Sequence, residues 1–292
     1  MNINKGYSQD EKMLRKYEDS LTSLSLIISL SKDYVEKENA NNILLKYFET
    51  VLETKNSFNY PFDFLKTISL QRSPDNLCRI ITWQLTASDG SCKHFGFVQL
   101  NPKKFIDTLV FRLYDRTDSI AHADIADLDR FHWYGAIYYK LIQEKTKDKT
   151  YYTLLGWNSN NQLSNKKIID VLTISEDGKI LFGADIFQGY NKKKKMKRIL
   201  FEYAKNSTMS LKYQQQNKSL NNQKLWMIVF DRLIPLSQNL EGVYCYYVPA
   251  TNIFDAFIFD KGKWNFIKDI DARNQPTKIK KRKPEMGIVP KK

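Results

Sequence analysis

Hydrophobic residues recur at helical spacing near the start of the chain. One stripe, with intervals of three and four residues, comprises Leu14, Tyr17, Leu21, Leu24 and Ile28. A second stripe comprises Ile43, Leu44, Tyr47, Phe48, Val51 and Leu52. Ser8 and Glu11 have the spacing of a capping box at the start of the first helix. We therefore predict an antiparallel pair of helices within residues 8–55.

From about residue 67 the pattern changes to short β-branched and aromatic runs between turn signals. We predict strands at 80–85, 94–98, 108–114, 134–143, 151–156, 167–175 and 179–182. Three later hairpins are expected, which pair 198–203 with 209–214, 226–231 with 243–248, and 256–259 with 264–268. The turns at Asp89-Gly90 and Asp177-Gly178 favour antiparallel pairing.

The predicted fold class is α+β, with the N-terminal helical pair on a large, mainly antiparallel β domain. That domain is expected to be a sandwich or a curved many-stranded sheet. We divide the chain into a helical segment at 1–55, a mainly-β domain at 56–271 and a basic flexible tail at 272–292. The hydrophobic content of 42% suffices for a sizeable core. No apolar run is long enough to form a transmembrane helix.

The formal net charge of +14 raises the question of a nucleic-acid partner. Two local runs carry nearly all of this charge, so the rest of the chain is close to neutral. The candidates for nucleic-acid or anionic-surface binding are Lys192, Lys193, Lys194, Lys195, Lys197, Arg198, Lys278, Lys280, Lys281, Arg282 and Lys283. A solvated loop and tail explain the same runs, and we favour this interpretation because lysines far outnumber the arginines that base recognition prefers.

The densest polar cluster of the sequence is a candidate metal site. Its members are His122, Asp124, Asp127, Asp129 and His132. Imidazole and carboxylate groups are ordinary ligands of divalent metals. The spacing matches no recognised metal signature, however, and an acidic connecting loop before a strand at Trp133 explains the same residues.

Motifs of nucleophilic catalysis are missing from the sequence. It contains three histidines, and we find no nucleophile elbow, zinc-protease motif, P-loop or dinucleotide fingerprint. We expect His94 to be structural because it lies within a predicted strand. The aspartates from which a hydrolase could draw a carboxylate pair are Asp231, Asp255, Asp260, Asp269 and Asp271. We predict no cofactor.

Tyrosines gather in the predicted strands. They include Tyr138, Tyr139, Tyr151, Tyr152, Tyr244, Tyr246 and Tyr247. Adjacent strand residues face opposite sides, so each doublet is expected to place one ring in the core and one outside. The outer rings either form a sugar- or peptide-binding platform or simply fill the strand surface.

The cysteines leave the cellular compartment open. Cys78, Cys92 and Cys245 are too few for a disulfide scaffold or a zinc site. A two-residue turn at Asp89-Gly90 would place Cys92 opposite Ala87, so a bridge to Cys78 needs another register. Acidic residues precede the mildly apolar stretch 24–30, where a leader would be basic. We therefore expect a cytoplasmic chain, or one whose leader has been removed.

Three sets of segments together suggest a family. The first joins 57–63 to 73–76, the second joins 133–136 to 151–157 and 165–167, and the third joins 240–242 to 262–264 and 269–274. In these segments the chain resembles a family of uncharacterised, usually exported proteins of Bacteroidota. The resemblance implies a periplasmic or cell-envelope location and supplies no catalytic residues.

Our combined expectation is a non-enzymatic binding or assembly protein of the bacterial cell envelope with a protein partner. Nucleic-acid or anionic-surface binding through the two lysine-rich runs is the first alternative. A metal- or carboxylate-dependent hydrolase is the second.

Overall fold

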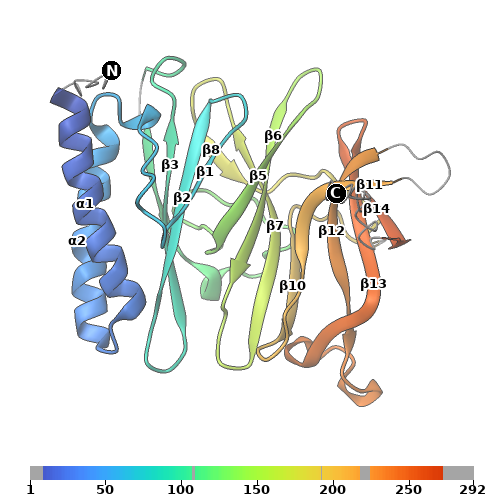
Figure 1. Cartoon of the computed structure of the whole chain (residues 1–292). Coiled ribbons are helices and arrows are strands. Elements are labelled where there is room, and N and C mark those ends of the chain that lie inside the picture. Colours follow the sequence, from blue (N-terminus) through green and yellow to red (C-terminus); the bar gives the residue numbers. More distant parts are fainter. Residues whose placement is uncertain (1–8, 107–108, 192, 218–223, 272–292) are drawn as a thin grey trace, which may run out of the picture.

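The computed structural model describes residues 9–106, 109–191, 193–217 and 224–271. The chain begins with two helices, α1 (Gln9–Leu30) and α2 (Tyr34–Glu53), which lie side by side (Figure 1). The Asp33 carboxylate caps α2, since it accepts a hydrogen bond of 2.9 Å from the backbone N–H of Val35. None of the described helices is long and apolar enough to cross a membrane.

The described strands form three sheets, which use the strands largely in chain order except that β9 of sheet 3 precedes β10 of sheet 2. Sheet 1 contains β1 (Ser69–Arg72), β2 (Cys78–Thr86), β3 (Cys92–Leu100) and β4 (Val110–Tyr114). Sheet 2 contains β5 (Ile137–Lys145), β6 (Thr150–Asn158), β7 (Ser164–Ile174), β8 (Ile180–Phe182) and β10 (Ile199–Ala204). Sheet 3 contains β9 (Phe187–Gln188), β11 (Leu211–Asn217), β12 (Lys224–Pro235), β13 (Tyr247–Asp260) and β14 (Lys263–Ile270).

In the part of the chain that the structure describes, four short 3-10 helices lie in the connections between strands and helices. They are η1 (Ser57–Asn59), η2 (Thr117–Ser119), η3 (Gln238–Leu240) and η4 (Tyr244–Tyr246). Within the described sheets the strand pairs are antiparallel, except that β14 pairs with β9 in parallel.

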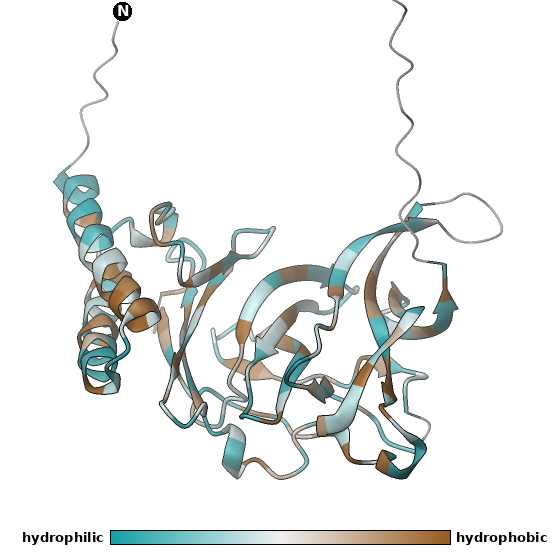
Figure 2. Ribbon diagram, turned by 60° about the horizontal axis from the view of Figure 1, so that its bottom comes forward, coloured by the Kyte–Doolittle hydropathy of each residue, from teal (hydrophilic) through white to brown (hydrophobic). Residues whose placement is uncertain are grey.

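The helices and sheets stack in chain order, with the helical pair on the outer face of sheet 1 (Figure 1). Ile81 and Phe97 of sheet 1 pack against the helices, whereas their neighbours Ile80 and Val98 pack against sheet 2. This follows from the two-residue period of a strand. Figure 2 shows the resulting mixture of hydrophobic and hydrophilic positions along helices and strands.

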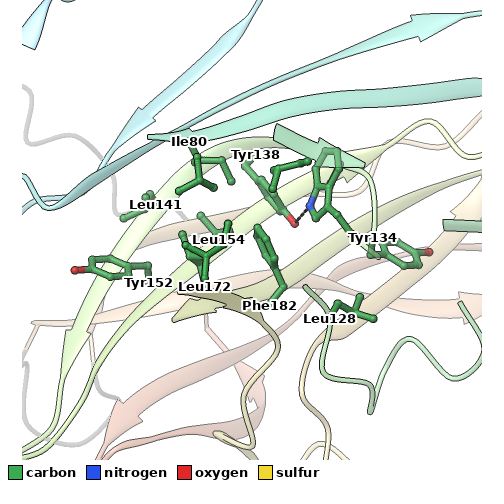
Figure 3. Packing of buried hydrophobic residues seen from close by; sticks show 14 of the residues in the cluster. Ile80, Leu128, Tyr134, Tyr138, Leu141, Tyr152, Leu154, Leu172 and Phe182 are labelled. Atoms are coloured by element: carbon green, nitrogen blue, oxygen red, sulfur yellow. Dashed lines mark hydrogen bonds between the residues drawn. The ribbon is translucent and has the colours of Figure 1, made fainter. Parts of the chain in front are cut away.

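The interface between sheets 1 and 2 is a large hydrophobic core. Figure 3 shows Ile80 of β2 facing Leu154 and Leu172 of sheet 2, with Phe182 beside them. A polar contact lies inside this core, where the Trp133 indole donates a hydrogen bond of 3.1 Å to the Tyr138 hydroxyl.

The α+β architecture predicted from the sequence is confirmed. The first stripe is buried as expected, because Leu14, Leu21 and Ile28 belong to the hydrophobic core that the helical pair shares with sheet 1. In the second stripe, Ile43 and Tyr47 stay exposed on the outer side of α2. The proposed cap residue Ser8 lies outside the described residues.

Two of the three predicted late hairpins are wrong. The strand at 198–203 pairs with β7 of sheet 2, whereas the strand at 209–214 pairs with β12 of sheet 3. The chain passes from one sheet to the next at this point, which turn signals do not reveal. The strand at 226–231 pairs with 254–258 of the 14-residue strand β13, not with 243–248. The hairpin of β13 and β14 is confirmed.

The tyrosine doublets 138–139 and 151–152 place their two rings on opposite faces as expected, but the outer rings are half-buried. Tyr138 and Tyr152 are buried against sheet 1, while Tyr139 and Tyr151 pack against the core on the other face of sheet 2. Both faces of sheet 2 are covered, so neither ring of a doublet faces open solvent as a platform.

A fully buried ion pair joins two parts of sheet 2. The Arg198 side chain lies 3.1 Å from the Asp170 carboxylate, and both side chains are 0% exposed. The Tyr138 hydroxyl donates a further hydrogen bond of 3.3 Å to Asp170, and Arg198 also donates to the carbonyls of Ala123 and Ala126. Arg198 therefore holds the loop before β5 against the central sheet.

We predict that Arg198→Met lowers the free energy of unfolding by about 3–5 kcal/mol, because it leaves the Asp170 carboxylate buried and unpaired. Urea denaturation is the measurement. The double variant Arg198→Met/Asp170→Leu should be more stable than the single variant, since no isolated charge remains. The exposed Lys195→Met is the control, with an expected change within about 0.5 kcal/mol. A single variant as stable as that control contradicts the assignment.

Candidate functional site

The predicted metal cluster does not assemble in the structure. Asp124 lies 3.6 Å from Lys194, Asp127 contacts Lys197, and Asp129 lies 2.9 Å from its neighbour His132. His122 takes a left-handed backbone conformation within the same loop. Among the residues that the structure describes, no three His, Cys, Asp or Glu side chains form a group able to hold a metal ion. The cluster does not form because the carboxylates of Asp124 and Asp127 pair with lysines.

The first lysine-rich run supplies those lysines. Lys194 and Lys197 face the acidic loop, and Lys195 lies 3.6 Å from Asp185. The prediction that Arg198 belongs to an anion-binding surface is wrong, because its side chain is completely buried beside Asp170. Four of the five described basic residues of the run thus have a carboxylate partner. Lys192 and the candidates of the tail, Lys278, Lys280, Lys281, Arg282 and Lys283, lie outside the described residues.

Part of the run still surrounds a hollow of about 340 Å³. Lys193, Lys194, Lys195 and Lys263 line it together with a single carboxylate, Asp185. Because Lys195 and Lys263 both approach Asp185, at 3.6 and 3.9 Å, much of the positive charge is already neutralised inside the protein.

His94 is buried in sheet 1 and pairs with an aspartate. Its Nδ1 lies 3.1 Å from the Asp115 carboxylate, which also accepts from the His94 backbone N–H and from Thr117. The His94 Nε2 is buried without a hydrogen-bond partner in the described structure. Both side chains are nearly inaccessible, at 1% and 7% exposed, so the pair cannot meet a substrate. Its arrangement supports the structural role expected for His94.

A larger cavity, of about 500 Å³, lies between the end of α2 and sheet 1. Its buried floor consists of Leu52, Ser57, Phe58, Gln99 and Asn101. The segment after α2 turns sharply here, because Asn56 adopts a left-handed conformation before η1. Exposed residues form the rim, namely Glu53, Lys55, Asn56, Asn59, Pro102 and Lys103.

Hydrogen bonds hold the polar floor in place. The Gln99 amide donates to the Leu52 carbonyl at 2.6 Å and to the Ser57 hydroxyl at 2.9 Å. The Ser57 hydroxyl in turn donates to the Leu52 carbonyl at 2.8 Å. These bonds also satisfy a carbonyl at the C-terminal end of α2, which a helix otherwise leaves unpaired. The floor is therefore preorganised.

A buried guanidinium is bonded to this floor. Arg79 is 0% exposed and donates to Gln99 Oε1 at 2.6 Å and to the carbonyls of Tyr60 and Ser57 at 2.9 Å. Burial and the nearby Arg72 lower the pKa of Arg79 to about 9, so the group stays charged at neutral pH. Within the described residues no carboxylate lies at ion-pair distance from it. This positive charge is consequently not neutralised.

Neither Arg79 nor Gln99 is among the site residues predicted from the sequence. Each stands in a run of apolar strand residues, Arg79 before Ile80-Ile81 and Gln99 after Phe97-Val98. Opposed residues of an antiparallel pair share a face, and the register places Arg79 directly across from Gln99. A charged residue inside an apolar strand run was the available signal.

The aspartates considered for a hydrolase carboxylate pair do not all lie at one site. Asp231 and Asp255 line a third, smaller pocket of about 160 Å³, beside Arg232. Asp269 lies outside this lining but contacts Arg232 at 2.7 Å. Arg232 holds Asp255 with two hydrogen bonds, which occupy both carboxylate oxygens. Asp255 is thereby engaged as an ion-pair partner, which argues against the hydrolase alternative at this pair.

The three cysteines are free thiols. In the register of the hairpin, Cys92 lies opposite Thr86 and not opposite the expected Ala87. The register differs by one residue because the turn contains Ser88 in addition to Asp89 and Gly90.

Comparisons with protein-family models, curated proteins and solved structures found no match to this chain.

The paired Asp115 makes stability depend on pH. Burial alone raises the pKa of Asp115, but hydrogen bonds from His94 and Thr117 outweigh it and lower that pKa to about 2. A pKa below the ordinary value of 3.8 stabilises the folded state above pH 4, and this contribution is lost as the pH falls from about 4 to 2.

We predict that Asp115→Asn lowers the free energy of unfolding by about 2 kcal/mol at pH 7 and by progressively less between pH 4 and pH 2. Denaturant titrations at each pH provide the measurement. The neighbouring exposed residue supplies a control, Asp118→Asn, whose free energy of unfolding at pH 7 should stay within about 0.5 kcal/mol of the unmodified protein. A constant deficit of Asp115→Asn down to pH 2 would be evidence against a depressed pKa.

Proposed function

We propose that this protein is a non-enzymatic binding protein whose ligand occupies the cavity between α2 and sheet 1. The observation that carries the proposal is a preorganised polar floor above a buried, unneutralised Arg79 guanidinium. At about 500 Å³ the cavity is within the range of small-molecule sites, and it is larger than the hollow beside Lys193.

The charges favour an anion. Arg79 lies behind the floor, and Lys55 and Lys103 stand on the rim. Two groups oppose them, the carboxylate of Glu53 and the C-terminal end of α2 with its partial negative charge. The helix end is worth about half a charge and its Leu52 carbonyl is already hydrogen-bonded, so the positive groups outweigh both.

The apolar lining favours a ligand with a hydrocarbon part. Leu52, Phe58, Leu109 and Val110 face the cavity together with the polar groups. An amphiphilic anion, such as a carboxylate or phosphate with a short alkyl chain, matches both features. The described lining offers no histidine or cysteine and a single carboxylate, so it supports binding better than acid-base catalysis.

The cell-envelope location and the protein partner remain proposals that rest on the family resemblance.

Polyanion binding by the lysine-rich runs is a second candidate function, supported by the hollow beside Lys193. The internal pairing of Lys194, Lys195 and Lys197 weakens it.

We predict that octanoate binds more tightly than octylammonium, which carries the opposite charge, and more tightly than acetate, which lacks the chain. Isothermal titration calorimetry on the full chain is the measurement. Lys55→Glu/Lys103→Glu should weaken octanoate binding by about tenfold, as expected for two partly screened charges. The matched control is Lys147→Glu/Lys149→Glu, on a distant exposed turn. Equal affinity for the two octyl compounds would remove the basis for an anion site.

For the second candidate, we expect duplex DNA binding to fall steeply with salt and to vanish when Lys193, Lys195 and the basic residues of 278–283 are reversed to glutamate. Fluorescence anisotropy at several salt concentrations measures both effects. Binding that survives the reversal excludes the lysine-rich runs as the DNA-binding surface.

A further inference from the structure

A pocket of about 160 Å³ opens where the edge of sheet 2 meets sheet 3 and η4. Its aromatic lining comprises Tyr190, Phe201, Phe230, Tyr244 and Tyr247. The rings contact one another, with centroids 4.7 Å apart for Phe201 and Phe230 and 5.1 Å apart for Tyr244 and Tyr247. Tyr244 is 58% exposed and offers its ring at the mouth.

Carboxylates outnumber cations in the same lining. Glu202, Asp231 and Asp255 line the pocket with only one basic residue, Arg232. Arg232 forms ion pairs with both Asp255 and Asp269, so its charge is already neutralised within the protein. In a chain with a net charge of +14, this is a local concentration of negative charge.

Asp231 is the least engaged of these acids. Within the described residues its side chain accepts one hydrogen bond, of 2.7 Å, from the backbone N–H of Ser210. Glu202, by contrast, accepts from the Ser164 hydroxyl at 2.6 Å and lies 3.8 Å from Lys166. Asp231 therefore keeps acceptor capacity for a ligand.

The electrostatic environment agrees with this geometry. Burial raises the pKa of Asp231 and outweighs the hydrogen bond from Ser210 and the nearby charge of Lys212, which both lower it. Burial, together with Asp255 and Tyr244, raises the pKa of Tyr190 to about 12, which keeps that ring neutral. A bound cation would relieve the cost of an ionised carboxylate in a partly dehydrated site.

We propose that this pocket binds a small organic ammonium ion, with aromatic rings around the charge and Asp231 as its counter-ion. Ring faces attract cations through their quadrupole, and tyrosine is among the effective partners. The small volume fits a headgroup and excludes a drug-sized ligand. The site is separate from the cavity between α2 and sheet 1, and it prefers the opposite charge.

The test uses choline and its neutral isostere 3,3-dimethyl-1-butanol, with n-butylammonium to distinguish quaternary from primary amines. Binding to the full chain is measured by NMR, from the shifts of the tyrosine ring signals at constant ionic strength. We expect at least one of the two ammonium compounds to bind about tenfold more tightly than the neutral isostere.

Two variants locate the site. Tyr244→Leu keeps an apolar side chain but removes the ring, and Asp231→Asn keeps an acceptor for Ser210 but removes the charge. Each should weaken binding of the ammonium compound about threefold to tenfold. The controls are Tyr246→Leu, on the same 3-10 helix but outside the lining, and Asp260→Asn, at the far end of β13.

The neutral isostere binding as well as both ammonium compounds would overturn the proposal, as would unchanged binding in Tyr244→Leu and Asp231→Asn. Equal losses in the control variants would also overturn it, because binding would then lie elsewhere. Circular dichroism of each variant confirms that a loss of binding is not a loss of fold.

Discussion

Sheet 2 is buried on both faces, and the rest of the protein is arranged around this constraint. Ile168 and Leu172 face sheet 1, while Ile169 and Val171 face sheet 3. A charged side chain in a sheet that is covered on both faces needs a partner of opposite charge, because burying an isolated ion costs several kcal/mol. The pairing of Asp170 with Arg198 therefore fixes where β10 joins the sheet. It also holds the loop that precedes β5, through the carbonyls that Arg198 binds.

The cavities lie where the layers end. The cavity beside α2 forms at the junction of the helical pair and sheet 1, and the pocket lined by Tyr190, Tyr244 and Tyr247 forms at the junction of sheets 2 and 3. At such edges, strand positions that would be apolar in the middle of a layer carry Arg79, Gln99 or Asp231. The two sites differ in sign, one having an unneutralised guanidinium behind it and the other a carboxylate with spare acceptor capacity.

The net positive charge of the chain is a poor guide to what its described surface offers. Asp124 and Asp127 approach Lys194 and Lys197 across about seventy residues of sequence. Taken separately, the acids are only candidate metal ligands and the lysines only candidates for polyanion binding. In the folded chain these acids and lysines form ion pairs with each other. The electrostatic potential of each site then depends on the few charges that remain without a partner.

The helical pair, the α+β class and the local hairpins were determined by the sequence, because periodicity and glycine-containing turns act over a few residues. Leu14, Leu21 and Ile28 show this for α1, and β13 with β14 shows it for the strands. Only the tertiary structure decided which sheet each strand joins and which charges meet. Tyr139 illustrates the difference: its position in a strand sets the direction of its ring, but a second sheet covers that face. Arg79 reaches Gln99, Ser57 and Tyr60 for the same reason, since contacts between distant segments depend on how layers stack and leave no periodic signal in the chain.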